Sequence, residues 1–358
     1  MSVTPSKILV FHTAFIGDVV LTLPLVQRLR ASFPTAHITF VAIPSAANVL
    51  ENHPAINNIL IYDKRRRDSG FGGMFRLVRR LRDDAYDVAI IPHRSLRSAL
   101  VGWLSRIPRR IGFSTSAATT LFTDIVPYDK RSHEIDRNLR LLQPLGLTHS
   151  GTELPTLYPS QNDRDVVDAF LTAQFLAASN HGRRREDVIS IAPGSAWNTK
   201  RWLKEHFIAL GKMLVKDGYS IVLVGGREDN VLCNDIKNGI GAGAVVNAAG
   251  MLTLLQSAEL IRRCVALVSN DSAPVHLAAG VETPVVAIFG ATAPAFGFAP
   301  RGAHDIVVET HGLMCRPCAI HGGRKCPIKT FACMTDLKPE LVYSKVQTII
   351  GGFGSEVQ

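Results

Sequence analysis

The sequence predicts an α/β protein made of two domains, each built on a parallel sheet covered by helices. Short apolar runs rich in β-branched residues recur through both halves, and a stretch with helical spacing follows nearly every one of them. This alternation is typical of parallel sheets, because a crossover helix must connect successive parallel strands. A segment rich in Gly, Pro, Thr and Ser, residues 148–159, separates the halves and predicts a linker.

The first half alternates strand and helix from its beginning. Strands are expected where the apolar runs lie, at 7–12, 37–42, 56–62, 86–91 and 110–113. Helices are expected at 17–34, 45–50, 74–82, 95–105 and 135–145. The helix at 74–82 combines an apolar stripe with several arginines, which predicts one face packed on the sheet and one basic face.

The second half repeats the pattern. Strands are expected at 187–192, 219–224, 244–247, 265–268 and 284–289. Helices are expected at 163–178, 204–217, 231–238, 253–263 and 339–350, the fourth of them opened by a capping box from Thr253 to Gln256.

These elements predict a domain organisation. We expect a first domain over 1–155, a second over 160–335 with a Cys-rich loop at 311–333, and a C-terminal helix within 338–358 that is free to pack back on the first domain. A deep cleft between the domains is expected. Because ligands of open α/β sheets bind at the carboxyl ends of the strands, function is expected in the loops that follow strands.

Composition narrows the function classes. The chain has 358 residues, of which 46% are hydrophobic, and a formal net charge of +10, which suits anionic partners. Basic residues cluster at 64–67, 76–82 and 94–110, all in the first half. No zinc-finger spacing, RNP-type motif or repeat favours nucleic acid. No apolar run approaches the roughly 18–20 residues of a membrane span, and the N-terminus does not resemble a signal peptide, so we expect a cytoplasmic protein.

One loop of the second half has the pattern of an anion site. Asp271, Ser272, Ala273 and Pro274 follow a buried strand and begin a helix, with His276 in its first turns. A helix N-terminus offers free backbone N–H groups and a positive dipole end, which suit a phosphate. An ordinary capped crossover helix with a solvated His explains this stretch equally well on local grounds.

Another candidate follows the first strand of the chain. Asp18 lies at a helix start after a loop with one glycine, so the loop is not a dinucleotide-binding GxGxxG motif. The helix N-terminus stabilises the carboxylate, which could act as a general base. A simple first-turn Asp is the alternative.

Two further loops of the second half carry charge. Residues 193–202 combine Gly194, Ser195, Lys200 and Arg201, and Lys200 could serve as a point charge for a diphosphate; a solvated helix start is the alternative. Glu228 follows a Gly-Gly turn after a strand, where an acidic residue often accepts hydrogen bonds from ribose hydroxyls.

Four of the six cysteines form a C-x2-C-x7-C-x6-C pattern. They are Cys315, Cys318, Cys326 and Cys333. In a cytosolic chain this pattern favours a tetrathiolate zinc or iron site over disulfides. The alternative is a compact loop of reduced cysteines, and any metal there is expected to be structural.

Taken together, these loops resemble the ADP-heptose:lipopolysaccharide heptosyltransferases, glycosyltransferase family 9. The resemblance rests on several blocks in order, at 17–24, 193–202, 270–276 and 289–294, with the Cys315–Cys318 tail behind them. The Lys200-Arg201-Trp202 sequence is most similar to the heptosyltransferase II branch. The sequence departs from the pattern at Ala273, where relatives usually have Gly.

The resemblance implies a GT-B fold, with two Rossmann-like domains facing across a cleft, and an inverting transfer that requires no cofactor. It implies Asp18 as the general base on the acceptor hydroxyl and Lys200 as the cation that stabilises the leaving diphosphate. Glu228 would bind the adenosine ribose, and the backbone near Ala249 would face adenine.

The resemblance also implies the remaining contacts to the nucleotide sugar. Asp271 and His276 would hold the heptose and phosphates, with the backbone N–H groups of Ser272 and Ala273. Ser195 would line the same pocket.

The implied partners are ADP-heptose, a phosphorylated lipid A–Kdo core acceptor and the anionic inner-membrane surface, which the basic first half would face from the inner side. Alternatives are a family 9 transferase for a different nucleotide sugar or acceptor, a nucleotide-sugar epimerase with two Rossmann-like halves, and a non-catalytic nucleotide-sugar-binding protein.

Overall fold

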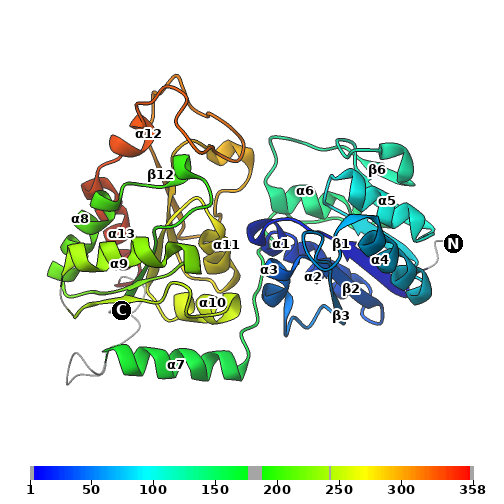
Figure 1. Cartoon of the computed structure of the whole chain (residues 1–358), viewed down its shortest axis with the longest axis horizontal. Coiled ribbons are helices and arrows are strands. Elements are labelled where there is room, and N and C mark those ends of the chain that lie inside the picture. The colour runs from blue at the N-terminus through cyan, green and yellow to red at the C-terminus, as the bar shows by residue number, and fades with distance from the viewer. Residues whose placement is uncertain (1–3, 176–187, 242, 355–358) are drawn as a thin grey trace. The chain divides into compact units, whose positions relative to one another are not determined.

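The structure is a computed structural model that describes residues 4–175, 188–241 and 243–354 (Figure 1). The chain forms two compact units, Met1–Tyr158 and Pro159–Gln358. Each unit contains a six-stranded, wholly parallel sheet. The predicted α/β class with two Rossmann-like domains is therefore confirmed.

The first unit has the strand order β3-β2-β1-β4-β5-β6. Its strands are β1 (Lys7–Phe11), β2 (His37–Ala42), β3 (Asn58–Ile61), β4 (Val88–Ile91), β5 (Arg109–Phe113) and β6 (Asp124–Val126). Its helices are α1 (Ile16–Val20), α2 (Leu23–Ser32), α3 (Pro44–Ala47), α4 (Gly70–Asp84), α5 (Leu96–Leu104) and α6 (Glu134–Arg140). Its central strands β1, β2 and β4 are buried at nearly every position, as expected of a parallel sheet covered by helices.

The second unit has the strand order β12-β11-β10-β7-β8-β9. Its strands are β7 (Val188–Ala192), β8 (Ser220–Leu223), β9 (Val245–Asn247), β10 (Ala266–Asn270), β11 (Val285–Phe289) and β12 (Ile306–Glu309). Its helices are α7 (Gln161–Phe175), α8 (Lys204–Lys216), α9 (Asn230–Ile240), α10 (Leu254–Arg262), α11 (Ala273–Gly280), α12 (Ala332–Thr335) and α13 (Pro339–Gly354), with 3₁₀ turns η5 (Asn198–Lys200) and η6 (Arg227–Asp229).

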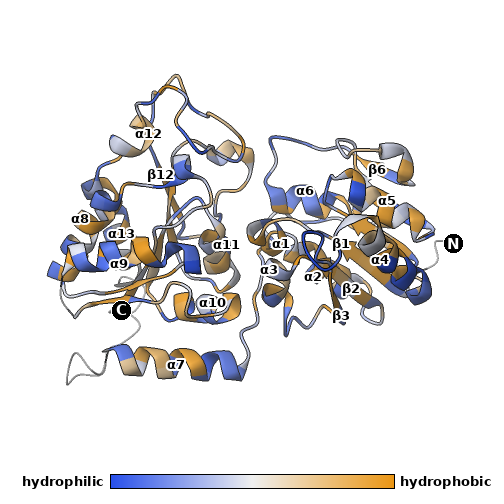
Figure 2. Cartoon of the chain, viewed as in Figure 1, coloured by the Kyte–Doolittle hydropathy of each residue, from blue (hydrophilic) through white to orange (hydrophobic). Residues whose placement is uncertain are grey.

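Hydropathy explains why these runs become central strands. Figure 2 shows apolar colour along the strands of both sheets, while the helices are striped. The strands β7, β10 and β11 are buried at every position. Strands buried on both faces need near-continuous apolar sequence, whereas a covering helix needs only one apolar stripe.

Several boundaries differ from the sequence prediction. The single helix expected at 17–34 is two helices, because Leu21 and Thr22 form a turn before α2 begins at Leu23, with Pro24 in its first turn. The short edge strands β6 and β12 were not predicted. The helix α4 begins at Gly70 rather than Met74. The ends of the predicted helix 163–178 and strand 187–192 that fall within 176–187 lie outside the described residues.

The C-terminal helix α13 packs on α8 in the second unit. It contributes Val342, Val346 and Ile349 to the core of that unit. Tyr343 and Gln347 donate to Asp217 at the end of α8, at 2.6 and 2.9 Å. The described contacts of this helix therefore belong to the second unit, and the expected return to the first domain stays a prediction.

Candidate functional site

The candidate residues of the second unit gather where the strand order reverses. Successive strands run from β7 towards β8 and β9 on one side, and from β10 towards β11 and β12 on the other. The loops after β7 and β10 therefore diverge and leave room at the carboxyl edge between them. This is the position at which open α/β sheets bind ligands.

An ion pair lies at this edge. Lys200 Nζ is 2.6 Å from Asp271 Oδ2, and the two side chains are 14% and 7% exposed. Thr292, from the loop after β11, donates its hydroxyl to the same carboxylate oxygen at 2.6 Å. Two residues predicted from separate loops are thus in direct contact, and each charge has a close partner in a largely desolvated place.

Asn270, the last residue of β10, joins the surrounding loops. Its side-chain oxygen accepts from Trp202 N at 3.0 Å, and its amide donates to Pro193 O at 2.8 Å. The side chain is fully buried, so both bonds form away from water, where an unmade bond is costly. Asn270 therefore fixes the segment 193–202, which carries Ser195 and Lys200, against the start of α11.

The N-terminus of α11 has the predicted form. Ser272 precedes the helix in extended backbone, and its hydroxyl makes no capping bond to α11. It donates instead towards Gly194 O at 3.3 Å and Asn270 O at 3.2 Å. The buried residues Ser195 and His276 lie in the neighbouring loop and in α11 itself. The Ser272 side chain thus leaves the start of α11 uncapped, while Val275 N donates to Ser272 O at 3.1 Å and Pro274 has no N–H. A helix start without a side-chain cap suits an anionic ligand.

The loop after β8 lies beside the loop after β7. A Cβ on Gly194 would stand 2.3 Å from the Asp229 carboxylate, so the glycine permits this approach. Asp229 accepts from Gly226 N at 3.0 Å, and burial raises its pKa. Glu228, the predicted ribose ligand, is exposed in η6.

The backbone at Ala249 is already bonded. Its N–H donates to Asn247 Oδ1 at 2.9 Å, and its carbonyl accepts from the Asn230 amide at 3.1 Å. Ala249 is buried at the end of β9. A hydrogen bond from adenine to this backbone would have to use the second lone pair of the Ala249 carbonyl. The contact between Ala249 and adenine remains a prediction.

The Cys-rich loop packs directly on the Lys200 segment. Gly323 exchanges two hydrogen bonds with Thr199, accepting from Thr199 N at 3.1 Å and donating to Thr199 Oγ1 at 2.7 Å. Cys318 N donates to Ala291 O at 2.9 Å. Arg316 donates to the carbonyl of Thr292 at 2.8 Å and pairs with Glu309 at 2.6 Å. The loop therefore supports the backbone on both sides of the Lys200–Asp271 pair.

The four thiols of this loop do not form a ready metal site. None of the six cysteines, all of which lie within the described residues, forms a disulfide, and Cys318 donates its thiol to Cys315 O at 3.1 Å. Across the described ranges 4–175, 188–241 and 243–354, no group of three or more His, Cys, Asp or Glu is placed to hold a metal ion. A zinc or iron site at Cys315, Cys318, Cys326 and Cys333 stays a prediction that metal analysis must test.

In the first unit, Asp18 lies after β1, beside the point where β1 and β4 diverge. It is half-buried in α1, and its carboxylate accepts from Phe15 N at 3.2 Å. Its carbonyl accepts from Thr22 Oγ1 at 2.8 Å, and Thr22 in turn bonds His12 at 2.7 Å. These bonds fix the turn that carries Asp18.

A second carboxylate lies close to Asp18. Glu134 begins α6 and accepts from Arg137 Nη1 at 2.6 Å, with Arg137 only 2% exposed. Burial raises the pKa of Glu134 to about 7 against the attraction of Arg137, and the negative charge of Asp18 adds to the increase. Asn138, one turn further on, donates to Leu21 O at 3.3 Å, so α6 is held against the turn after Asp18.

Basic and neutral groups line the same edge of the first sheet. Lys64 Nζ donates to Thr13 O at 2.7 Å, and burial with the nearby charges of Arg65 and Arg97 lowers its pKa. Burial lowers the pKa of His93 to about 4. Such a histidine is uncharged at neutral pH, and His93 bonds Ser98 Oγ at 2.9 Å.

Sequence reasoning missed several residues of this edge. Thr292 lies within the block 289–294 but had no predicted role, and Asp229 was not among the predicted site residues. Glu134 and Arg137 form an i,i+3 charge pair at the start of a predicted helix, and this pattern could have marked them.

Comparisons with known proteins agree with this architecture. Residues 74–326 match the model of the family described as glycosyltransferase family 9 (heptosyltransferase). The chain is 29% identical over 298 residues to lipopolysaccharide heptosyltransferase 2 of Escherichia coli K12, covering 81% of this chain and 84% of that protein.

Solved structures give the same result. A family 9 glycosyl transferase from Veillonella parvula is 26% identical with a TM-score of 0.85, covering 98% of each chain. E. coli ADP-heptose lps heptosyltransferase II is 26% identical with a TM-score of 0.77, covering 97% of this chain and 99% of that one. These matches confirm the GT-B fold class that the motifs predicted. The chain belongs to glycosyltransferase family 9, the heptosyltransferase family, and is a glycosyltransferase.

Proposed function

We propose that the protein transfers L-glycero-D-manno-heptose from ADP-heptose to the inner core of lipopolysaccharide, on a lipid A–Kdo–heptose acceptor. The family and the similarity to heptosyltransferase 2 support this substrate class. The observation that carries the proposal is the Lys200–Asp271 pair beside the N-terminus of α11. A cation, an acceptor of hydroxyl hydrogen bonds and a helix N-terminus without a side-chain cap are what a sugar diphosphate requires.

The proposed reaction is a direct, inverting displacement. Asp18 takes the proton of the acceptor hydroxyl as its oxygen bonds to the anomeric carbon of the heptose. The bond from that carbon to the diphosphate breaks, and ADP leaves with the bonding electrons. Attack from the face opposite the leaving group inverts the anomeric centre, and no cofactor is needed.

The leaving diphosphate needs charge stabilisation. Lys200 would supply it together with the N–H groups of Ser272 and Ala273, since preorganised donors act where charge develops. Asp271 would then exchange its bond to Lys200 for the heptose hydroxyls, with His276 and Ser195 beside it. Glu228 would accept from the ribose hydroxyls.

What supports Asp18 as the base is its place at a helix N-terminus, half-buried and close to Glu134. A helix N-terminus stabilises negative charge. The acceptor would bind on the first unit, which carries most of the arginine clusters. No helix of the described residues is long and apolar enough to cross a bilayer, so the enzyme would meet its lipid acceptor peripherally, at the inner face of the inner membrane.

The test is a product assay. The protein is incubated with ADP-heptose and a panel of truncated core lipids, and product masses identify donor and acceptor. We expect Asp18→Asn to retain ADP-heptose binding. Its kcat should fall by about 10²–10⁴-fold, the usual contribution of general base catalysis. Lys200→Ala should lose turnover, whereas the matched exposed variant Lys212→Ala should not.

Other outcomes would redirect the assignment. Full activity of Asp18→Asn would contradict the base assignment. Turnover of another nucleotide sugar with inert ADP-heptose would favour a different family 9 donor. Binding of ADP-heptose without any product across the panel would favour a non-catalytic binding protein.

A further inference from the structure

The helix α4 carries an exposed aromatic face on the first unit. It buries Met74, Leu77, Val78 and Leu81, which recur at helical spacing and pack on the sheet. Phe71 and Phe75 lie one turn apart along the flank of this buried stripe, and they are 78% and 56% exposed. Two neighbouring exposed phenylalanines are not needed for this packing.

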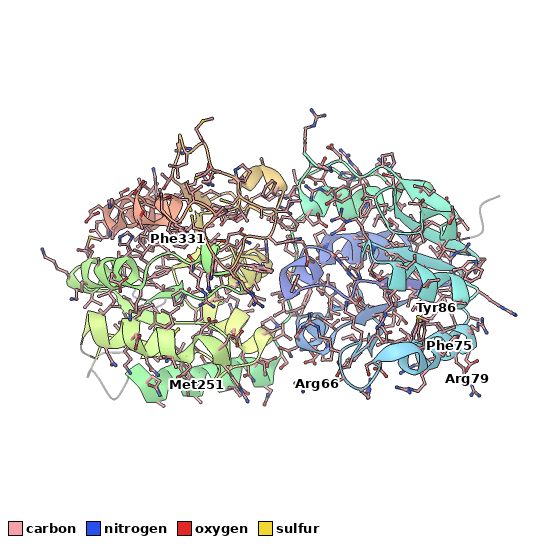
Figure 3. All side chains as sticks on the ribbon, turned by 45° about the horizontal axis from the view of Figure 1, so that its top comes forward. Arg66, Phe75, Arg79, Tyr86, Met251 and Phe331 are labelled. Carbon is pink, nitrogen blue, oxygen red and sulfur yellow. The ribbon has the colours of Figure 1, made fainter. Side chains whose placement is uncertain are left out.

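The segment that contains these phenylalanines is strongly basic. It has arginines at positions 65, 66, 67, 76, 79, 80 and 82, and the last four lie on α4 itself and are exposed. Arg79 continues the row of Phe71 and Phe75 by a further turn, and Figure 3 shows Phe75 and Arg79 together on α4.

The acidic side chains of this segment offset little of that charge. Asp68 pairs with Arg67 and Arg76, whose side chains remain 70% and 62% exposed. Asp83 and Asp84 lie at the far end of α4, away from Phe71.

This combination has the chemistry of a bilayer-surface site. Amphipathic helices at membrane interfaces place aromatic side chains among the acyl chains and basic side chains among anionic headgroups. Each Lys or Arg near an anionic surface strengthens binding by about fivefold. No zinc-finger spacing, RNP-type motif or repeat in the sequence favours a nucleic acid as the partner of this helix.

We propose that α4 docks the enzyme on an anionic phospholipid bilayer, with Phe71 and Phe75 inserted into the interface and Arg76, Arg79 and Arg80 on the headgroups. This deepens the proposed function, because a lipid-borne acceptor must be reached at a membrane surface. It assigns membrane contact to one helix rather than to the basic first unit as a whole.

Vesicle co-sedimentation of the full chain tests the proposal. Vesicles of phosphatidylethanolamine with phosphatidylglycerol are compared with vesicles of phosphatidylcholine alone. We expect the parent to bind the anionic vesicles, and Phe71→Ser/Phe75→Ser to bind them about 10- to 100-fold more weakly. Arg79→Glu/Arg80→Glu should lose at least about 25-fold on anionic vesicles, with little change on neutral ones.

Matched variants of the second unit serve as controls. Val231→Ser removes another exposed apolar side chain, and Lys212→Glu/Lys216→Glu reverses two exposed charges on α8. Both controls should bind vesicles like the parent. All variants should keep the parental melting temperature and the parental turnover of a soluble, deacylated acceptor, which separates docking from transfer.

Four results would overturn the proposal. The α4 variants could bind vesicles like the parent, or the second-unit controls could lose as much binding. Equal loss of activity on the soluble acceptor would place α4 in the acceptor site instead. A change from oligomer to monomer in analytical ultracentrifugation of Phe71→Ser/Phe75→Ser would assign the face to a second copy of the chain. Absence of any transferase activity in the parent would contradict the proposed function alone.

Discussion

Breaking the buried pair between Lys200 and Asp271 should destabilise the second unit strongly. The side chains are 14% and 7% exposed and 2.6 Å apart. Removing one partner of a buried pair leaves an uncompensated charge, at a cost of about 3–5 kcal/mol. In a domain of about 200 residues, this corresponds to a fall in melting temperature of roughly 6–20 °C. We expect the destabilisation of Lys200→Ala, which leaves Asp271 unpaired, to lie within this range. Asp271→Ala should lie towards its lower end, because the charge that it leaves unpaired, Lys200, is the more exposed of the two.

The double variant separates pairing from the simple loss of side chains. Lys200→Ala/Asp271→Ala leaves no unpaired charge, so its destabilisation should be smaller than the sum of the single variants by about 1–3 kcal/mol. Thermal and urea unfolding, followed by circular dichroism, measures all four members of the cycle. Lys204→Ala/Asp235→Ala is the control, since that pair at 2.9 Å is 40% and 48% exposed and should contribute at most about 1 kcal/mol.

Ligand binding extends the same cycle. If a diphosphate replaces Asp271 as the partner of Lys200, ADP should raise the melting temperature of Asp271→Ala at least as much as that of the parent. ADP should have little effect on Lys200→Ala. Two results would refute the assignment of this pair to the diphosphate. One is that the destabilisations of the two single variants add up to that of the double variant. The other is that ADP stabilises Lys200→Ala as much as the parent.

Three further outcomes are expected. Burial raises the pKa of Glu134 to about 7, so the folded state favours the protonated acid. Protonated Glu134 therefore adds up to about 3 kcal/mol to the free energy of unfolding below pH 4.5, and this contribution is lost as the pH rises through 7. Glu134→Gln should remove this pH dependence. Urea unfolding at pH 5 and pH 8 checks this, and an unchanged slope would contradict it. Gly194→Ala should weaken ADP binding measured by calorimetry, because the new Cβ would stand 2.3 Å from the Asp229 carboxylate. If the variant binds ADP as tightly as the parent, the close packing of Gly194 against Asp229 is not needed for binding. Metal analysis of purified protein should find about one zinc or iron per chain if the Cys-rich loop 311–333 binds metal, and a metal-free sample of normal stability would end that hypothesis.

Much of the fold followed from the sequence because its pattern is strong. Strands such as β7, β10 and β11 are buried at every position, so their apolar runs leave no other role for them. The edge strands β6 and β12 escaped prediction because they are short and only partly buried. Edge strands need less apolar sequence, and their pairing depends on neighbours distant in the chain.

Lys200 and Asp271 were both candidates from the sequence, but their direct contact was not predicted. The strand order places the carboxyl ends of β7 and β10 side by side, and this brings Lys200 near Asp271. The contribution of Thr292 depends on how the loop after β11 bends, which no local pattern specifies. The support from Arg316 depends likewise on a loop without regular structure.

The first unit shows the same limit. Proximity of Glu134 to Asp18 requires α6 to pack beside the turn after α1, through Asn138 and the carbonyl of Leu21. Those elements are more than a hundred residues apart in the chain. Local propensity predicts both helices but carries no information about this contact.

The hydrogen bonds between Gly323 and Thr199 have a consequence for building hybrid enzymes. Donor specificity is commonly altered by exchanging loops or half-domains between relatives. In this chain, segment 198–202 and loop 311–333 hold each other in place through those bonds and through the bond from Asn198 to Arg324 O at 3.3 Å. The two segments behave as one interchangeable part despite a separation of more than a hundred residues. A chimera that takes these two segments from different parents would contain Lys200 without the backbone hydrogen bonds that fix its position.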